Sequence, residues 1–416
     1  MGRETKNLEF KERVNRTFLK TVSAYANYEG GIIRFGVRDD GTVAGLEQPS
    51  EDALKIEHLI NDSIDPVPDY SLSIEDDSTI TLNVGKGVFT PYLYQGSAYR
   101  RSDTSTIKVE RLEYNRLVLK GQNLSFEEAV SDKQDLSFGT LENELVDHLG
   151  ISGLTDDVLK TLELVNQFGE FNNAAALLAD SNNFSGLDCA RLGDNVNEIR
   201  KREQLFNVSV LEQLHRVMEL FREHYVYELV QGSRRETVEL IPQEAFREAI
   251  ANALVHRRWD ISGAILVRMH PNRIEVSSPG SLPEGISVDE YLEGYLSLLR
   301  NPILANVFFR LGYIEKFGTG IARIKYAYRN SIVQPSFTVN AASVFISLPV
   351  IEAGRSLTDD ERRVYEALGE NLSSRVKIQQ KAELGRDKTI RVLNSLIEMG
   401  AAEKTGSGPA VAYRRK

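Results

Sequence analysis

The chain has 416 residues, of which 41% are hydrophobic and 26% charged, and its formal net charge is −10. This composition indicates a globular protein of several domains; it excludes a disordered chain and a surface that is basic all over. One cysteine excludes an intrachain disulfide and a multi-cysteine zinc site, and no apolar run is long enough to cross a membrane. We therefore expect a cytoplasmic protein without a membrane partner.

Residues 1–115 are expected to form an α/β domain. The spacing of Phe18, Val22 and Tyr25 predicts a helix over residues 14–27. Residues 32–37 favour a strand, and Asp39-Asp40-Gly41 predicts a hairpin turn after it. Further along, Arg100 and Arg101 lie among tyrosines, a pattern that suits contact with nucleic-acid phosphates and bases but also occurs on an ordinary solvated sheet.

These N-terminal segments resemble one family. The motif Glu9-Phe10-Lys11, the run from Ser23 to Asn27, the glycine-rich stretch from Glu29 to Gly41 and the later segments 90–94 and 98–103 are similar to the AlbA_2 (divergent AAA-4) domain shared with the schlafen proteins. The resemblance covers most of residues 4–106. It implies binding of nucleic acid, either DNA or RNA.

The same resemblance raises an enzymatic alternative. Some schlafen proteins are metal-dependent ribonucleases that use two glutamates near the Glu-Phe-Lys motif and an aspartate after the glycine-rich strand. By that resemblance, Glu4, Glu9 and either Asp39 or Asp40 would hold Mg²⁺ or Mn²⁺. The alternative is that Glu9 pairs with a nearby lysine or arginine while the two aspartates only shape the turn.

Residues 136–230 are expected to be a helical connector. Helices are predicted at 142–149, 155–164 and 208–228, and the last of these carries an amphipathic stripe of leucine, valine and phenylalanine. The segment from Leu187 is left open. No chemistry is visible in this region, which favours a scaffold or dimer surface.

The strongest helix prediction covers Gln243 to Asp260, a stretch rich in alanine that follows Pro242. At 100° per residue, Glu248, Asn252 and His256 form a row on one face. A glutamate one turn before an asparagine suits a general base beside an oxygen ligand for Mg²⁺, although such a spacing is also common on solvated helix faces. This row is the central candidate site.

Three features follow this helix in the order that a known superfamily uses. Residues 264–269 and 273–276 predict a hairpin turned at Pro271-Asn272, and the glycine-rich turn from Phe317 to Ile321 precedes a helix that runs to about Tyr328. The Glu-x-x-x-Asn row resembles the N-box of the GHKL ATPases. The whole of residues 231–350 resembles the divergent GHKL-like family labelled as the C-terminal domain of a RecG-type ATP-dependent DNA helicase.

That resemblance implies ATP and Mg²⁺ as cofactors and weak ATPase activity. Glu248 would be the general base and Asn252 the metal ligand through the nucleotide. The other implied nucleotide-binding residues are His256, Ser278, Gly280, Gly318, Thr319 and Gly320. Ser278 stands where the superfamily has an aspartate that recognises adenine, so the base contact would be made by a hydroxyl without charge.

Residues 355–416 are expected to form a winged helix. Helices at 359–368, 375–382 and 387–399 followed by a hairpin over 401–413 give its order, and this region has 13 lysines and arginines against 9 aspartates and glutamates. The predicted recognition helix is marked by Arg386, Lys388, Thr389, Arg391 and Asn394. A protein-interaction module is the alternative.

Together these features predict an α/β multidomain protein with an AlbA_2-like domain, a helical connector, a GHKL-like sandwich and a winged helix. We expect a DNA-binding transcriptional regulator, dimeric and switched by ATP, with the nuclease as the alternative function. No Gly-x-x-x-x-Gly-Lys-Ser/Thr motif is present, so a P-loop helicase motor is not expected.

Overall fold

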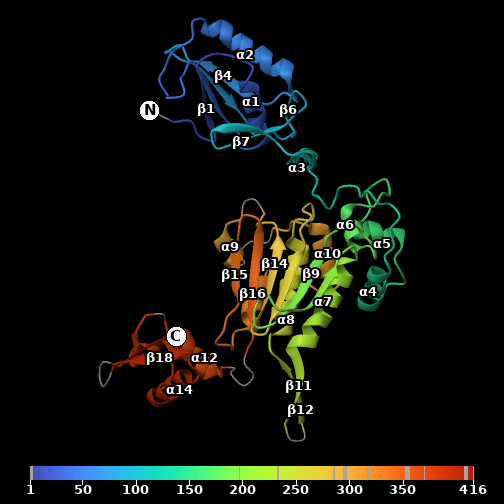
Figure 1. The fold of residues 1–416 in the computed structure, drawn as a ribbon, viewed down its shortest axis with the longest axis vertical. Coiled ribbons are helices and arrows are strands. Elements are labelled where there is room, and N and C mark those ends of the chain that lie inside the picture. The colour runs from blue at the N-terminus through green and yellow to red at the C-terminus, as the bar shows by residue number, and fades with distance from the viewer. Residues whose placement is uncertain are drawn as a thin grey trace. The chain divides into compact units, whose positions relative to one another are not determined.

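The computed structural model describes residues 3–195, 197–231, 234–283, 286–293, 298–315, 318–351, 357–369, 371–406 and 411–415. Residues 316–317, 352–356 and 407–410, which include the first residue of the predicted glycine turn and part of the predicted C-terminal hairpin, lie outside these ranges. The chain divides into an N-terminal unit, Met1–Ala129, and a C-terminal unit, Val130–Lys416. Figure 1 shows both as mixtures of helices and strands, which confirms the predicted α/β multidomain class.

The N-terminal unit is built on a four-stranded sheet in the order β1-β2-β5-β4. Strands β1 and β2 are parallel, because helix α1 returns the chain between them, and the other pairs are antiparallel. Its elements are β1 (Leu8–Lys11), α1 (Phe18–Asn27), β2 (Gly31–Phe35), α2 (Pro49–Ser63), β3 (Ile64–Asp65), β4 (Tyr70–Ile74), β5 (Ile80–Val84), β6 (Leu93–Tyr94), β7 (Tyr99–Ser102), β8 (Ser105–Lys108) and α3 (Arg111–Gly121).

Helix α1 is buried along most of its length. The rings of Phe18 on α1 and Phe35 on β2 meet edge to face at 5.1 Å between centroids. At the other end of α1, Asn27 donates from Nδ2 to the Tyr92 carbonyl and accepts from the Tyr92 amide at 2.7 Å. The sequence motif from Ser23 to Asn27 therefore fixes the loop before β6.

The C-terminal unit contains a six-stranded sheet in the order β10-β9-β13-β14-β16-β15. Before its central helix come α4 (Gly139–Leu149), α5 (Asp156–Thr161), α6 (Asn173–Leu178), β9 (Leu187–Leu192), β10 (Ile199–Leu205), α7 (Val210–Tyr225), β11 (Val226–Gln231) and β12 (Arg234–Glu239). From that helix onward come α8 (Gln243–His256), β13 (Ile265–His270), β14 (Arg273–Pro279), α9 (Val288–Glu293), α10 (Pro302–Arg310), α11 (Gly320–Ala327), β15 (Ser336–Val339) and β16 (Ser343–Pro349).

Residues 136–230 are mainly helical, and the segment from Leu187, which the sequence left open, forms strands. Residues 187–205 form β9 and β10, and β9 pairs in parallel with β13 of the later region. Buried Leu187, Cys189 and Leu192 show why the segment joins the sheet.

Helix α8 packs against β14 and contacts both α7 and α11. The rings of Phe221 on α7 and Phe246 on α8 stack at 4.7 Å between centroids. The predicted hairpin after α8 is confirmed, with β13 and β14 antiparallel around Pro271-Asn272. Thus α8 is held on one face by the sheet and on its flanks by two helices.

The C-terminal region contains α12 (Asp359–Ala367), β17 (Ser373–Ser374), α13 (Arg375–Ala382), α14 (Arg386–Glu398), β18 (Ala402–Thr405) and β19 (Ala412–Arg415). The strands form a small sheet in the order β17-β19-β18. Helix α12 begins with a capping box in which Thr358 and Glu361 satisfy each other's amides. Among the described residues, no helix combines the length and apolar character that a membrane crossing needs.

Candidate functional site

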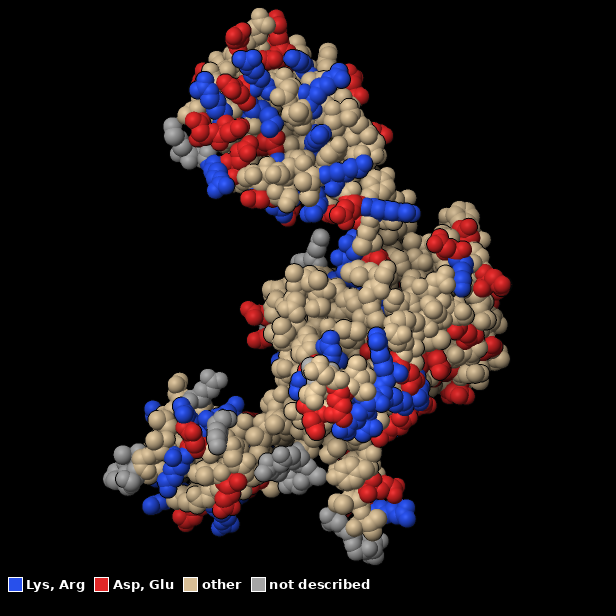
Figure 2. Space-filling view, in the orientation of Figure 1, with Lys and Arg blue, Asp and Glu red and all other residues tan. Residues whose placement is uncertain are grey.

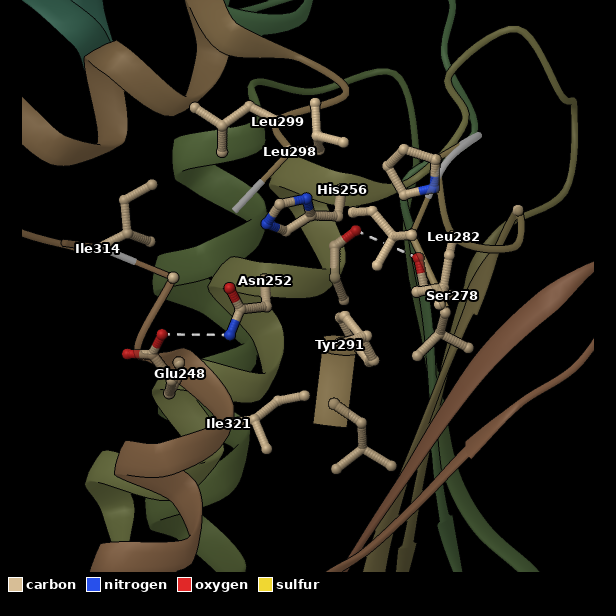
Figure 3. Close-up of a pocket in the computed structure, with 18 of the residues that line it drawn as sticks. Glu248, Asn252, His256, Ser278, Leu282, Tyr291, Leu298, Leu299, Ile314 and Ile321 are labelled. Carbon is tan, nitrogen blue, oxygen red and sulfur yellow. Dashed lines mark hydrogen bonds between the residues drawn. The ribbon is translucent and has the colours of Figure 1, made fainter. Parts of the chain in front are cut away.

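The row predicted on α8 lines a pocket in the C-terminal unit. Glu248, Asn252 and His256 follow one another along the helix and face the hollow between α8, the end of β14 and the start of α11 (Figure 3). The pocket also takes in Ser278, Gly280, Gly318 and Gly320, and Thr319 lies between the last two in the chain. The structure therefore gathers the residues that the sequence proposed for nucleotide contact.

Glu248 and Asn252 are bonded to each other. Asn252 Nδ2 donates to Glu248 Oε1 at 3.1 Å, while Glu248 Oε2 is buried without a hydrogen-bond partner. Glu248 is only 3% exposed, and burial raises the pKa of its carboxyl against the opposing charge of Arg323. An orphaned carboxylate oxygen in a half-enclosed pocket is poised to accept a proton or a hydrogen bond from a ligand.

The glycine-rich turn closes directly on this pair. A Cβ atom built on Gly320 would lie 2.4 Å from Asn252 Nδ2 and 2.6 Å from Glu248 Oε1. Gly318, two residues earlier, has φ = +65°, a conformation that glycine adopts without strain. Residue 320 must therefore lack a side chain for the first turn of α11 to approach the two polar groups this closely.

The opposite wall is formed where β14 ends. Ser278 is 9% exposed, and its hydroxyl donates to the Ala253 carbonyl on α8 at 3.2 Å. Gly280 follows with φ = +100°, and its amide donates to the Ala342 carbonyl at 2.8 Å. The Ser278 hydroxyl oxygen can still accept a hydrogen bond from a ligand, so this wall of the pocket suits a donor group on a heterocyclic ring.

Between the polar residues the pocket is lined by aliphatic and aromatic side chains: Val276, Leu282, Tyr291, Leu298, Ile314, Ile321 and Ile346. His256 lies at the far end of the row, where burial and the charge of Arg300 lower its pKa to about 4. The imidazole is therefore neutral at pH 7. An apolar slot with a few polar groups suits a flat heterocyclic ring.

Two residues that the site prediction omitted hold the end of α8. Arg300 donates to the His256 carbonyl at 3.1 Å, and Asn301 donates to the carbonyls of Val255 and Arg257 at 2.6 and 3.0 Å. These contacts satisfy carbonyls that a helix end leaves open. The sequence signal for this role is Asn301 directly before Pro302, a pairing that is typical of the start of a helix.

Arg257 was also missed. Its side chain is 1% exposed, lies 4.1 Å from the centroid of the Trp259 ring, and donates to backbone carbonyls of Ser185 and Gly263 at 2.5 Å each. Burial lowers its pKa to about 10. This guanidinium ties the loop before β9 to the loop before β13, and so it fixes the sheet beneath the pocket.

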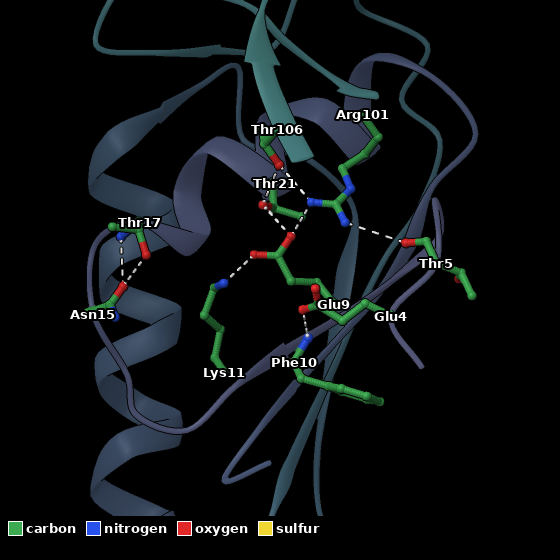
Figure 4. Close-up of polar contacts among 10 residues, drawn as sticks. All are labelled: Glu4, Thr5, Glu9, Phe10, Lys11, Asn15, Thr17, Thr21, Arg101 and Thr106. Carbon is green, nitrogen blue, oxygen red and sulfur yellow. Dashed lines mark hydrogen bonds and ion pairs between the residues drawn. The ribbon is translucent and has the colours of Figure 1, made fainter. Parts of the chain in front are cut away.

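The N-terminal carboxylates are not assembled as a metal site. Glu9 is 5% exposed and its oxygens are taken by ion pairs with Arg101 and, at 2.6 Å, with Lys11, while Thr21 donates to it at 2.9 Å (Figure 4). Glu4 accepts from the Phe10 amide at 2.8 Å. The side chains paired with Glu9 are thus cations, and their positive charge would repel a metal ion.

The two aspartates lie in the turn between the bridged residues Val37 and Val43, where Asp40 accepts from the Thr42 amide and hydroxyl. These bonds lower the pKa of Asp40. Within the described ranges, no group of three or more histidine, cysteine, aspartate or glutamate side chains is arranged to hold a metal. The structure does not bring Asp39 or Asp40 together with Glu4 and Glu9 as such a group.

Two of the residues proposed to contact DNA are corrected. Arg101 is 8% exposed and committed to Glu9, and Thr389 is fully buried with its hydroxyl donating to the Gly385 carbonyl at 2.9 Å. The exposed face of α14 instead carries Arg386, Arg391 and Asn394, with Lys388 paired to Asp360 at 2.7 Å.

Arg100 remains partly exposed and pairs with Glu113 at 3.3 Å. Figure 2 shows basic and acidic side chains interspersed over the visible face of the N-terminal unit. Because positive and negative side chains are mixed on that face, only individual lysines and arginines there, and no continuous basic patch, could contact a polyanion.

Comparison with known proteins gives two family matches and a similar solved structure. Residues 4–110 match the family described as "Schlafen, AlbA_2", and residues 263–348 match the family described as "Putative ATP-dependent DNA helicase recG C-terminal". No curated protein matches the chain. A crystal structure of the DIP2311 protein from Corynebacterium diphtheriae is similar with a TM-score of 0.52 and 19% identity, over 99% of this chain and 92% of that one, a likeness that shows the fold.

Proposed function

We propose that the pocket beside α8 binds ATP with Mg²⁺. The observation that carries this proposal is the Glu248–Asn252 pair, buried beneath Gly320 with Glu248 Oε2 unpartnered. A buried carboxylate that lacks a partner costs stability, and such a cost is typical of a site kept for a ligand or a reaction. The family match over residues 263–348 supports the same assignment.

The residues on α8 and β14 fit the metal and the base of the nucleotide. Asn252 Oδ1 is an oxygen ligand of the kind that Mg²⁺ prefers, and the bound ion would neutralise phosphate charge. Glu248 would accept a proton from an attacking water, and its raised pKa makes the carboxylate a stronger base for that role. The apolar slot would hold the base, and Ser278 would face its polar edge.

We further propose that the protein is a DNA-binding transcriptional regulator that acts as a dimer in the cytoplasm. The match of residues 4–110 to a schlafen-related family supports a nucleic-acid role. Residues 355–416 have the element order of a winged helix. The exposed face of α14, the second helix of its helix-turn-helix, carries Arg386, Lys388, Arg391 and Asn394. Weak ATP hydrolysis would reset the bound state.

The working division of the chain has four parts: 1–115 for nucleic acid, 136–230 as connector, 231–350 for nucleotide and 355–416 for DNA. Because β9 and β10 complete the sheet behind α8, the connector contributes to the nucleotide domain. In this scheme the nucleotide orders the segment from Ser278 to Gly320 and changes how the DNA-contacting regions are presented.

The functional proposal predicts that Mg·ATP changes the affinity for DNA. For wild-type protein we expect a change of at least about fivefold in the dissociation constant of a fluorescent random-sequence duplex, measured by anisotropy at fixed salt. Asn252→Ala should respond to neither nucleotide nor metal, whereas Glu244→Gln, an exposed change on the same helix, should behave as wild type. An identical wild-type affinity with and without Mg·ATP would refute the switch.

A further inference from the structure

The charges around the pocket pose a problem for a triphosphate. Among the described residues that line it, Glu248 and Glu315 are the charged side chains, and both are acidic. Mg²⁺ neutralises only part of the charge of ATP, so the remaining negative charge would be repelled by these carboxylates. A cation from the pocket's surroundings must therefore approach the phosphates.

Arg323 is the cation best placed to do so. It lies on α11, one turn after Gly320, on the same face of that helix. Its guanidinium pairs with Glu315, which itself lines the pocket, and its side chain is 28% exposed. The positive charge of Arg323 also acts on Glu248, so the guanidinium lies within electrostatic reach of the row on α8.

Neighbouring arginines are less suitable. Arg300 donates to the carbonyls of His256 and Ser281 at 3.1 and 2.7 Å and is part of the clamp on the end of α8. Arg258 pairs with Asp260 at 3.4 Å. The charge of Arg247 also acts on Glu248, but less than that of Arg323. Arg247 directly precedes Glu248 on α8, so its side chain is rotated about 100° from the row, and it lines a different hollow.

We infer that Arg323 recognises the terminal phosphate of ATP, and that Glu315 holds it in place until the nucleotide arrives. This inference rests on the proposed nucleotide site. The bound triphosphate would replace Glu315 as the partner of the guanidinium, because arginine pairs with phosphate through the same forked geometry as with carboxylate. The exchange would make the pocket distinguish ATP from ADP and would pull α11 and Gly320 towards the bound phosphates.

The test compares three ligands, Mg·ATP, Mg·ADP and adenosine, by titration calorimetry on the full chain. Arg323→Ala is expected to weaken Mg·ATP at least about tenfold and to leave Mg·ADP and adenosine within about twofold. Glu315→Gln should bind Mg·ATP as tightly as wild type or tighter, since it removes the competing carboxylate. Arg247→Ala is the matched control and should leave all three affinities unchanged.

The outcomes separate this inference from the proposal beneath it. A folded wild type that binds no nucleotide refutes the nucleotide site itself. If wild type binds Mg·ATP and Arg323→Ala binds it equally well, or loses ATP, ADP and adenosine alike, the phosphate role of Arg323 is wrong while the site stands. Thermal unfolding of each variant, together with the conservative Arg323→Lys, which should recover part of the ATP affinity, separates loss of binding from loss of structure.

Discussion

Gly320→Ala is expected to weaken Mg·ATP binding by about 100-fold or more while the protein stays folded. The added Cβ would lie 2.4 Å from Asn252 Nδ2 and 2.6 Å from Glu248 Oε1, much closer than van der Waals contact allows. Both atoms are ends of flexible side chains, so the collision is relieved by displacing the pair that the nucleotide needs. Alanine also favours the first turn of α11, so folding is not the weak point.

The control for this change is Gly385→Ala at the start of α14. A Cβ built there meets nothing within 4 Å. Alanine is a poorer N-cap than glycine, so this change costs α14 about 1 kcal/mol without adding an atom to the pocket. Titration of both variants with Mg·ATP, alongside circular dichroism, checks the prediction. Wild-type affinity in Gly320→Ala would mean that the approach of α11 to α8 has no part in ligand binding.

Glu248→Gln should abolish most ATP hydrolysis and at the same time stabilise the protein at neutral pH. Loss of a general base typically costs about 10² to 10⁴ in rate, whereas Asn252 remains to hold the nucleotide. Because burial raises the folded-state pKa of Glu248, the folded protein binds the carboxyl proton more tightly than the unfolded chain does. The stability that this proton provides is full below the unfolded pKa and is lost as pH rises through the folded pKa. Glutamine avoids this loss, so the gain in stability should grow as the pH is raised from about 4, near the unfolded pKa of glutamate, through neutrality.

Urea unfolding across that pH range and a phosphate-release assay measure the two effects. Glu244→Gln is the matched control, because it removes the same charge one turn earlier at an exposed position. This variant should hydrolyse ATP like wild type and should show no gain in stability that grows with pH. If Glu248→Gln were less stable than wild type at pH 8 and hydrolysed ATP normally, the buried carboxylate would be a structural residue.

The sequence was sufficient to predict the core of the site because its signals are local. Alanine content and the 3.6-residue period placed Glu248, Asn252 and His256 on one face of α8, and the Pro271-Asn272 turn placed the hairpin behind it. The glycines at 318 and 320 marked a close approach of backbone. The sequence did not show that Gly320 lies against Asn252 and Glu248, because these residues are about 70 positions apart.

Two of the failures come from pairing over long sequence distance, and a third comes from helix packing. Strand β9 was not recognised because Asp188 and Arg191 interrupt a short apolar pattern, and its partner β13 lies some 75 residues later. Arg101 looked like a surface cation, but its partner Glu9 is 92 residues away. Thr389 was counted as a contact residue from its place on a helix, whereas packing turned it into the core.

The most direct test of the nucleotide site is calorimetric titration of wild type and Asn252→Ala with ATP, each with and without Mg²⁺. We predict saturable binding by wild type that depends on Mg²⁺, and no measurable binding by a folded Asn252→Ala, because the amide that would hold the metal and pairs with Glu248 is gone. Equal binding by the variant, or no binding by folded wild type, would contradict the assignment of this pocket.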